Sequence, residues 1–553
     1  MSFGSRLATS LVALLGLSFA SCLVDGGLGG AHRLGRQMPR AARFMKLASG
    51  RIPKSAAPPE SGKWPEPSAE ELAQLEKDRG ETQTASFKTG DVLAPGDDEE
   101  EAPAADSGPA DDSKVDAELA LAATAKETYV YGQPSWRAKK IGYLRGGAIV
   151  KRSPSAVGNQ GCSGGWYRIA PQGFVCVGKN ATLDVTHPLV TASARRPDRN
   201  TGLPYVYGMS AFPSPPFYTK VPSPKEQAQV EQDLGYHFRK TLDPGWNEVP
   251  FEAIPDMITG GRQVMTWNGV RHSSRSLYVG RAVPKSGFAF LDFFEHEGRK
   301  FGLTVDLDVV PLDRMRRVVP SSFHGLALDG ETTLPVVFVM SQGAQLYSGD
   351  PRSSGLKPVR PLAFREALAV TALRVQRGGV RYAQTRSGEW LRDEQLVRVE
   401  PMRNRPGWAT DGRTWLDVSI LKQTLVAYEG QKPVYVTLVS TGADGLGDPK
   451  ETHSTVRGQF LIHTKHVTAT MSGDEIGDEF DLRDVPWVQY FQEGYAFHAA
   501  YWHDSFGRPK SHGCVNLAPL DARWLFHWTD PPVPQGWHGA MSLREGTLVH
   551  IHP

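Results

Sequence analysis

The hexapeptide Ser-His-Gly-Cys-Val-Asn at residues 511–516 decides the fold class of the last part of this 553-residue chain. A strand-like run, Tyr-Ala-Phe-His at 495–498, precedes it, and a Gly-Arg-Pro-Lys loop at 507–510 leads into it. Pro519 then opens a predicted helix whose apolar face is Leu520, Trp524 and Trp528, and a Pro-Pro pair at 531–532 ends it. This order predicts a β-rich domain with a short helix after the cysteine.

The cysteine of this hexapeptide is a candidate nucleophile. A free thiol has a pKa of about 8.5 and is mostly protonated at neutral pH, so it needs a neighbouring imidazole or a helix N-terminus. Gly513 allows a sharp turn before Cys514, and adjacent N–H groups there are candidates for an oxyanion hole. His512 is only two residues away, whereas His498 arrives from a separate strand. We therefore expect His498 to be the general base that holds Cys514 ionised.

At these residues the sequence resembles the L,D-transpeptidase catalytic domain. The matching segments are 425–430, 498–504, 506–507, 511–516, 521–526 and 546–551, and the resemblance spans about residues 405–553. It implies that Cys514 is the nucleophile, that His498 is its base and that the carbonyl of Ala499 orients His498. It also assigns the substrate and oxyanion pocket to four further residues, Ser511, His512, Gly513 and Asn516. One departure is the run Thr-Val-Arg-Gly-Gln-Phe at 455–460, where the family usually has a proline second.

The resemblance implies acyl transfer on peptidoglycan stem peptides. Cys514 would attack a tetrapeptide stem, expel the terminal D-Ala and form a thioester, which an amine then resolves into a 3-3 cross-link or an anchored protein. Two alternatives remain open, an L,D-carboxypeptidase that uses water and a non-catalytic cell-wall-binding lipoprotein. The resemblance implies no cofactor, and it implies that carbapenem inhibitors acylate Cys514.

A zinc site is a competing interpretation of the same residues. His498, His503, His512 and Cys514 are all metal-ligand types, but they show no recognised ligand spacing. His463 and the histidine three residues after it are a weaker metal pattern. We therefore expect no metal at these residues.

The N-terminal part predicts export. The apolar run at 7–20 is too short to span a bilayer and is typical of a secretory signal peptide. Its last residues, Phe-Ala-Ser-Cys at 19–22, resemble a lipobox at which Cys22 is lipidated; cleavage of an ordinary signal peptide near Ala20 or Ser21 is the alternative. We expect a signal peptide at 1–22, a disordered tether at 23–117, and a location in the cell envelope or periplasm as a membrane-anchored lipoprotein.

The four cysteines fit an oxidising compartment. Cys162 and Cys176 flank a turn-like and a strand-like segment, which is the arrangement of a disulfide that closes a hairpin. With Cys22 lipidated, Cys514 is left as the free thiol.

The middle of the chain predicts further β domains. Short β-type runs and turns at 118–185 resemble a bacterial SH3-like domain, a weaker echo recurs at 333–402, and 200–320 is an enlarged SH3-like or accessory β domain. The 57 Gly and 41 Pro of the chain are typical of turn-rich β structure. The expected fold class is therefore mainly β and multi-domain. A formal net charge of +2 gives no global field for nucleic acid, so no nucleic-acid partner is expected.

Overall fold

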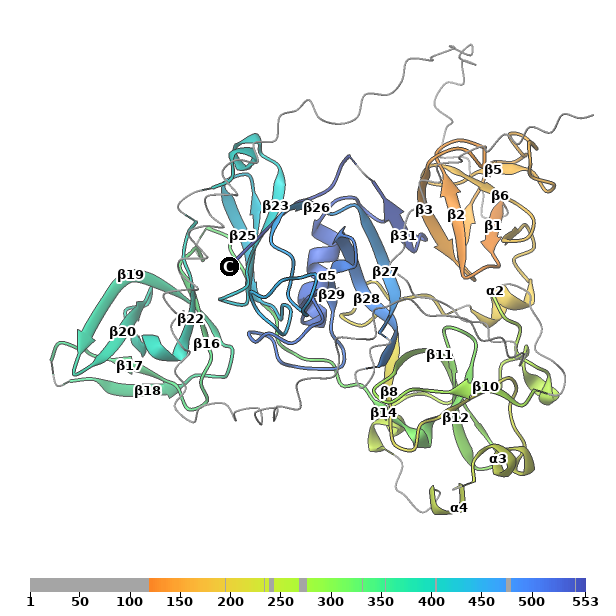
Figure 1. The fold of residues 1–553 in the computed structure, drawn as a ribbon, viewed down its shortest axis with the longest axis horizontal. Helices are drawn as coiled ribbons and strands as arrows, with labels where there is room; N and C mark the ends of the chain where they lie inside the picture. Colours follow the sequence, from red (N-terminus) through yellow and green to blue (C-terminus); the bar gives the residue numbers. More distant parts are fainter. Residues whose placement is uncertain are drawn as a thin grey trace, which may run out of the picture. The chain divides into compact units, whose positions relative to one another are not determined.

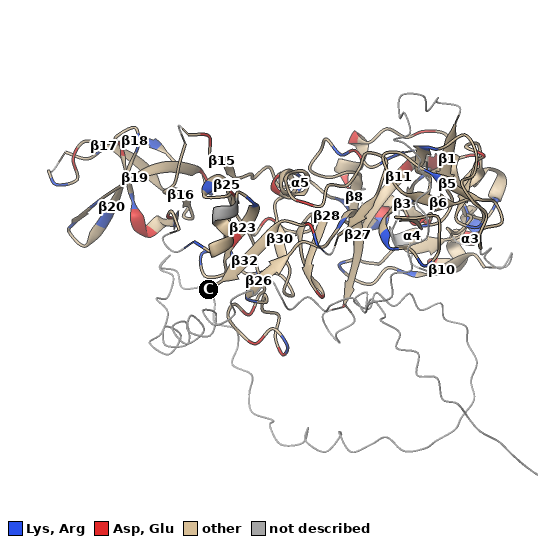
Figure 2. Cartoon of the chain, turned by 90° about the horizontal axis from the view of Figure 1, so that it is seen from above, with Lys and Arg blue, Asp and Glu red and all other residues tan. Residues whose placement is uncertain are grey.

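The computed structural model describes residues 119–553 apart from 194, 233, 238–242, 268–275, 331, 354, 403–404, 474–478 and 543. The signal peptide expected at 1–22, the tether at 23–117 and the lipidation candidate Cys22 lie outside the described residues. The described part is mainly β, with several sheets and few helices, as the sequence predicts (Figure 1). Acidic and basic residues are interspersed along its strands and loops (Figure 2). No helix of this part has the length and apolar character needed to cross a membrane.

Short antiparallel strands make up the first described segment. They are β1 (Ala120–Ala123), β2 (Glu127–Tyr131), β3 (Lys140–Arg145), β4 (Ile149–Lys151), β5 (Trp166–Arg168), β6 (Phe174–Cys176) and β7 (Ala181–Thr182). A disulfide joins Cys162 to Cys176, with an S–S distance of 2.02 Å. The expected pairing of these two cysteines is confirmed.

The second segment adds most of the helices. Its elements are α2 (Pro188–Ala192), β8 (Val206–Ser210), β9 (Pro216–Tyr218), α3 (Pro224–Val230), α4 (Leu234–His237), β10 (Tyr278–Arg281), β11 (Gly287–His296), β12 (Arg299–Thr304), β13 (Val309–Pro311) and β14 (Met315–Arg317). Short 3-10 turns of this segment lie at Pro244–Glu248, Thr259–Gly261 and Leu312–Arg314. Two more, Asp393–Gln395 and Gly407–Asp411, lie in later segments.

A third segment forms one seven-stranded sheet. Its strands are β16 (Val336–Val339), β17 (Gln345–Ser348), β18 (Lys357–Pro361), β19 (Ala367–Arg377), β20 (Val380–Thr385), β21 (Trp390–Arg392) and β22 (Leu396–Val399). The short strand β15 (Leu326–Ala327) belongs instead to the sheet of the last segment.

The last segment contains two groups of strands around a shared core. One sheet has the order β15-β25-β24-β23-β32-β26, with β23 (Thr414–Ser419), β24 (Thr424–Glu429), β25 (Lys432–Leu438), β26 (Gly458–Leu461) and β32 (Leu548–His552). The other group contains β27 (Thr464–Gly473), β28 (Phe480–Gln492), β29 (Tyr495–Ala499), β30 (Val515–Leu517) and β31 (Gly539–Met541). Buried side chains of β23, β29 and β30, among them Leu416, Phe497 and Val515, belong to one core cluster.

The helix after the cysteine is α5 (Pro519–Trp528). It begins at the expected proline, but its predicted apolar face is wrong. Leu520 is 42% exposed, whereas Ala522, Leu525 and Phe526 are buried in the core cluster. These three residues follow i, i+3 and i+4 spacing, which makes a compact stripe on a helix, and the tryptophans on the predicted face are only half-buried.

Candidate active site

Two neighbouring parallel strands bring Cys514 and His498 to one face of the sheet. The register of β29 and β30 pairs Phe497 with Val515 and His498 with Asn516. Cys514 immediately precedes β30 and therefore lies level with Ala496. Because side chains two residues apart on a strand share a face, the side chains at 496, 498, 514 and 516 point to the same side. The nucleophile and base expected from the sequence are thus diagonal neighbours.

The ring of His498 is oriented by its own backbone neighbour. Its Nδ1 lies 3.2 Å from the carbonyl oxygen of Ala499. A carbonyl only accepts, so Nδ1 carries the proton and the lone pair of the neutral ring is on Nε2. The ring also stacks on Trp502, with 5.7 Å between ring centroids. This arrangement leaves Nε2 as the nitrogen able to take a proton.

Burial favours the neutral forms of Cys514 and His498, whereas the sequence leads us to expect an imidazole that holds the thiol ionised. Burial raises the pKa of the Cys514 thiol to about 11, although a backbone hydrogen bond from Ala496 acts in the opposite direction. Burial lowers the pKa of His498 to about 4, partly offset by the hydrogen bond to Ala499. The thiol hydrogen bond goes to the carbonyl of Gly494, at 3.6 Å, and not to His498. Burial thus disfavours the charged form of each group.

The turn before Cys514 is held by a network that fixes its peptides. The Oγ of Ser511 donates to the Cys514 carbonyl and accepts from the Gly513 N–H at 3.1 Å. Gly513 has φ of +127°, and a Cβ there would come within 2.9 Å of the Tyr495 ring. Both constraints favour glycine at this position. The Oγ1 of Thr455 donates to the Gly513 carbonyl at 2.7 Å.

Thr455 also helps to hold this turn, although it is not among the site residues expected from the sequence. It is fully buried, and the Gly442 N–H donates to its Oγ1 at 2.8 Å. The sequence did contain a hint of this role. Thr455 is the first residue of the run at 455–460, and that run departs from the family pattern only where the family has a proline. The missing proline therefore leaves the hydrogen bond from this threonine in place.

Asn516 is paired with His503 beside the candidate base. The Ser505 N–H donates to Nδ1 of His503 at 3.1 Å, so in the neutral ring the proton lies on Nε2. That Nε2 is 2.9 Å from the amide of Asn516, whose facing atom must then be the oxygen. The amide nitrogen of Asn516 then lies at the other terminal position of the side chain. That position is buried and has no hydrogen-bond partner among the described residues.

His512, which the resemblance assigns to the substrate pocket, has aromatic neighbours. It is exposed, and its ring is 4.5 Å from that of His453 and 4.9 Å from that of Phe480, measured between centroids. The structure therefore places this residue in a cluster of aromatic rings.

One potential metal-binding group exists within the described residues, and it does not include the residues considered for zinc above. It is formed by Asp417, His550 and His552. His466, the second histidine of the weaker metal pattern, is buried with its Nδ1 2.9 Å from the Tyr143 hydroxyl.

Comparisons with known proteins agree with the resemblance seen in the sequence. A family model described as the L,D-transpeptidase catalytic domain matches residues 413–551. A Bacillus subtilis (strain 168) protein, YciB, named as a candidate L,D-transpeptidase, is 26% identical over 124 residues, which are 20% of this chain and 59% of that protein. The chain thus spans less than two thirds of this curated relative.

Solved structures of the same kind of protein are also similar. A mutant L,D-transpeptidase of Enterococcus faecium is 22% identical, with 25% of this chain and 49% of that chain covered and a TM-score of 0.19. L,D-transpeptidase 3 from Mycobacterium tuberculosis, in complex with a faropenem-derived adduct, is 17% identical, with 30% and 73% covered and a TM-score of 0.20. From the family match, the chain contains an L,D-transpeptidase catalytic domain, of a family of cysteine transpeptidases, at residues 413–551.

Proposed function

We propose that this chain is a peptidoglycan L,D-transpeptidase that forms a thioester between Cys514 and a tetrapeptide stem. The observation that carries the proposal is the parallel register of β29 and β30, which puts Cys514 and His498 on one face of a sheet inside the matched domain. The carbonyl of Ala499 directs the basic nitrogen of His498 away from its own backbone.

The first half-reaction releases D-Ala. The Cys514 sulfur attacks the carbonyl carbon that precedes the terminal D-Ala, while Nε2 of His498 takes the thiol proton. The C–N bond then breaks, and the same proton passes to the departing amine, so that free D-Ala leaves and the thioester remains. The resemblance assigns stabilisation of the negative charge on the oxygen to the turn around Gly513, where the Gly513 N–H itself donates to Ser511 Oγ.

The second half-reaction resolves the thioester. An amine attacks the thioester carbonyl, His498 accepts the amine proton, the C–S bond breaks and the sulfur regains its proton. With the amine of a second stem the product is a 3-3 cross-link, and with a protein amine it is an anchored protein. Water in place of the amine would give the carboxypeptidase product.

The neutral resting pair fits a reaction that begins only when substrate is bound. A thiol with a pKa of about 11 reacts slowly with small electrophiles, because little thiolate is present. Substrate binding and proton transfer to His498 then have to occur together. The buried base is suited to this role, since a free proton from solvent does not occupy it at neutral pH.

Mass spectrometry of products tests the proposal directly. The purified chain is incubated with a disaccharide-tetrapeptide, and the masses distinguish a cross-linked dimer from a tripeptide released by water. We expect D-Ala release and dimer formation, and neither product from Cys514→Ala. A Cys514→Ala chain that still binds sacculi while the wild type forms no product would indicate the non-catalytic wall-binding alternative.

A carbapenem provides a second readout of the same sulfur. We expect one covalent adduct on the wild-type chain, none on Cys514→Ala, and acylation slowed about 100-fold or more in His498→Gln, which lacks the base. His463→Gln is the matched control, because this histidine of the same domain lies outside the residues assigned to the site and its Nδ1 is 2.8 Å from the Thr464 hydroxyl, and its acylation should fall much less. Equal acylation of the His498 and His463 variants would contradict the base assignment.

The other parts of the chain are proposed to hold this domain at the cell wall. Export and lipidation of Cys22 would tether the chain to a membrane, and the segments at 118–185, 200–320 and 333–402 would act as SH3-like or accessory units. Radiolabelled palmitate incorporated by the wild type and not by Cys22→Ser would support the anchor. Equal incorporation would refute it.

A further inference from the structure

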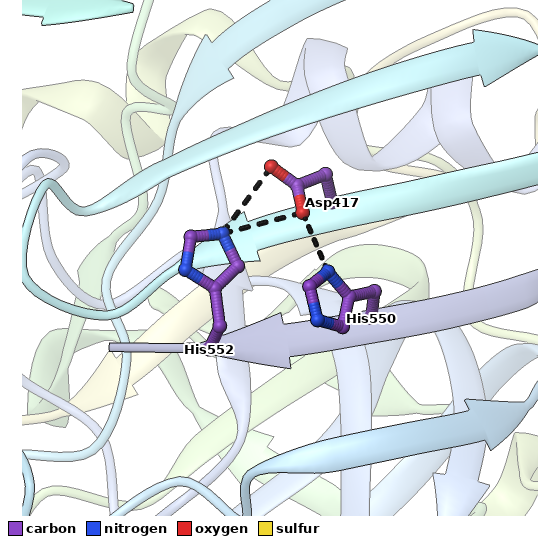
Figure 3. A group of neighbouring side chains, drawn as sticks. All are labelled: Asp417, His550 and His552. Carbon is purple, nitrogen blue, oxygen red and sulfur yellow. Dashed lines mark hydrogen bonds and ion pairs between the residues drawn. The ribbon is translucent and has the colours of Figure 1, made fainter. Parts of the chain in front are cut away.

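Three side chains gather on one face of the sheet that contains β23 and β32. Asp417 comes from β23, and His550 and His552 come from β32, the last strand of the described chain (Figure 3). The two strands run parallel, with Asp417 level with His550. His550 and His552 are two residues apart and therefore share that face.

The opposite face of the same two strands belongs to the core. Leu416 and Val418 of β23 are fully buried. Val549 and Ile551 of β32 are at most 1% exposed. The three polar side chains, in contrast, keep side-chain exposures of 13% for Asp417, 20% for His550 and 34% for His552. The group is therefore held by a rigid backbone, yet solvent reaches it.

The spacing of the donor atoms is that of a metal site. Nδ1 of His550 lies 2.9 Å from Oδ1 of Asp417, Nε2 of His552 lies 3.2 Å from the same oxygen, and all three atoms are within 4.8 Å of one another. A tetrahedral zinc with bonds of about 2.0–2.1 Å separates its ligand atoms by about 3.3 Å. The two distances to Asp417 are close to this separation, and the two ring nitrogens, which are at most 4.8 Å apart, would approach each other to share one ion.

We propose that Asp417, His550 and His552 bind one divalent transition-metal ion, with zinc as the best fit. Imidazole and carboxylate ligands suit zinc, and three protein ligands leave a fourth position for water on the exposed face. No net proton is lost from a neutral ring, because the proton on the binding nitrogen moves to the other ring nitrogen. The ion replaces two hydrogen bonds to one carboxylate with three bonds to one cation.

The ion would fasten the last strand of the domain. β32 lies between β23 and β26, and the metal would join residues 133 positions apart in the sequence. The site is separate from the Cys514 chemistry, since it lies on other strands. Its effect is therefore on metal content and unfolding, and it does not depend on the proposed transferase activity.

Metal titration of a chain with both Cys22→Ser and Cys514→Ser tests this site without interference from a free thiol. The chain is stripped with a chelator, exchanged into chelator-free buffer and titrated with ZnCl₂, and bound metal is measured by mass spectrometry after gel filtration. CoCl₂ is titrated in parallel, because tetrahedral cobalt with imidazole ligands gives visible absorption bands. We expect one equivalent of either metal and a higher unfolding temperature with zinc.

Three variants decide the assignment. Asp417→Asn and His552→Gln remove one ligand each with little change of shape, and we expect at least a tenfold loss of zinc affinity and loss of the cobalt bands. His463→Gln is the matched control, since it removes a histidine of the same domain outside the group, and it should bind as the parent does. Circular dichroism of the metal-free chains shows whether they fold alike.

Two results would overturn the proposal. One is a folded parent chain that takes up no zinc and shows no cobalt bands, which would mean that the three residues form only a hydrogen-bonded cluster. The other is uptake that Asp417→Asn and His552→Gln leave unchanged, which would place the metal elsewhere.

Discussion

Alkylation of Cys514 as a function of pH separates a neutral resting pair from a thiolate–imidazolium pair. With a thiol pKa of about 11, pH 7 lies four units lower, so about one sulfur in ten thousand is ionised. The thiolate fraction, and with it the alkylation rate, should therefore rise about tenfold per pH unit, or about a thousandfold between pH 6 and pH 9. A thiolate paired with an imidazolium would give a rate that changes little over the same range.

The assay uses iodoacetamide and intact-mass spectrometry on a Cys22→Ser chain. Cys162 and Cys176 are joined in the disulfide, so Cys514 is then the one reduced cysteine. A short peptide with a single cysteine is the reference, because its pKa of about 8.5 makes its rate level off near pH 9. The higher nucleophilicity of a high-pKa thiolate changes the absolute rate but leaves the slope intact.

A His498→Gln chain completes this test. If the imidazole does not ionise the resting thiol, the pH profile of alkylation should be nearly the same in this variant, although acyl transfer is lost. A wild-type rate that rises less than tenfold from pH 6 to pH 9, or a profile that collapses in His498→Gln, would refute the neutral pair.

Three further predictions concern the frame around the site. Gly513→Ala should lower carbapenem acylation at least tenfold while the chain stays folded, because φ is +127° and the new Cβ would meet the Tyr495 ring; unchanged acylation would refute the constraint. Lys465→Met should cost about 1–3 kcal/mol of unfolding free energy in urea, since the buried Nζ donates at 2.6 Å to the carbonyls of Phe526 in α5 and of Thr529 just after it, and an unchanged midpoint would contradict this. Reduction of the Cys162–Cys176 disulfide should cost about 3 kcal/mol for its 14-residue separation, measured by urea melts with and without reductant; coincident melts would show that it adds no stability.

Local patterns in the sequence predicted much of the fold. The alternation at 415–440 corresponds to the antiparallel strands β23, β24 and β25. Pro519 marks the start of α5, which ends at Trp528, shortly before the Pro-Pro pair at 531–532. The disulfide was also foreseen, because its two cysteines are close in the sequence. Each of these features depends on residues that are close together in the sequence, so a local pattern is enough to predict it.

The features that the sequence did not predict depend on burial or on distant partners. The charge states of Cys514 and His498 follow from how much protein surrounds them, which the motif does not report. The hydrogen bond from Thr455 to the Gly513 carbonyl joins residues 58 positions apart. The buried face of α5 was missed because apolar residues occur on two sides of the helix, and only packing selects between them.

The double hydrogen bond between Ser440 and Asn516 has a consequence for how specificity can vary. The two backbone N–H groups each donate to the other residue's carbonyl at 2.9 Å, which fastens the strand after the nucleophile to the end of β25 as well as to β29. The reacting sulfur thus has little freedom to follow differently shaped ligands. Engineering this enzyme toward other acceptors would have to remodel the loops at 441–455 and 500–510, and repacking the strands would cost reactivity before it changed selectivity.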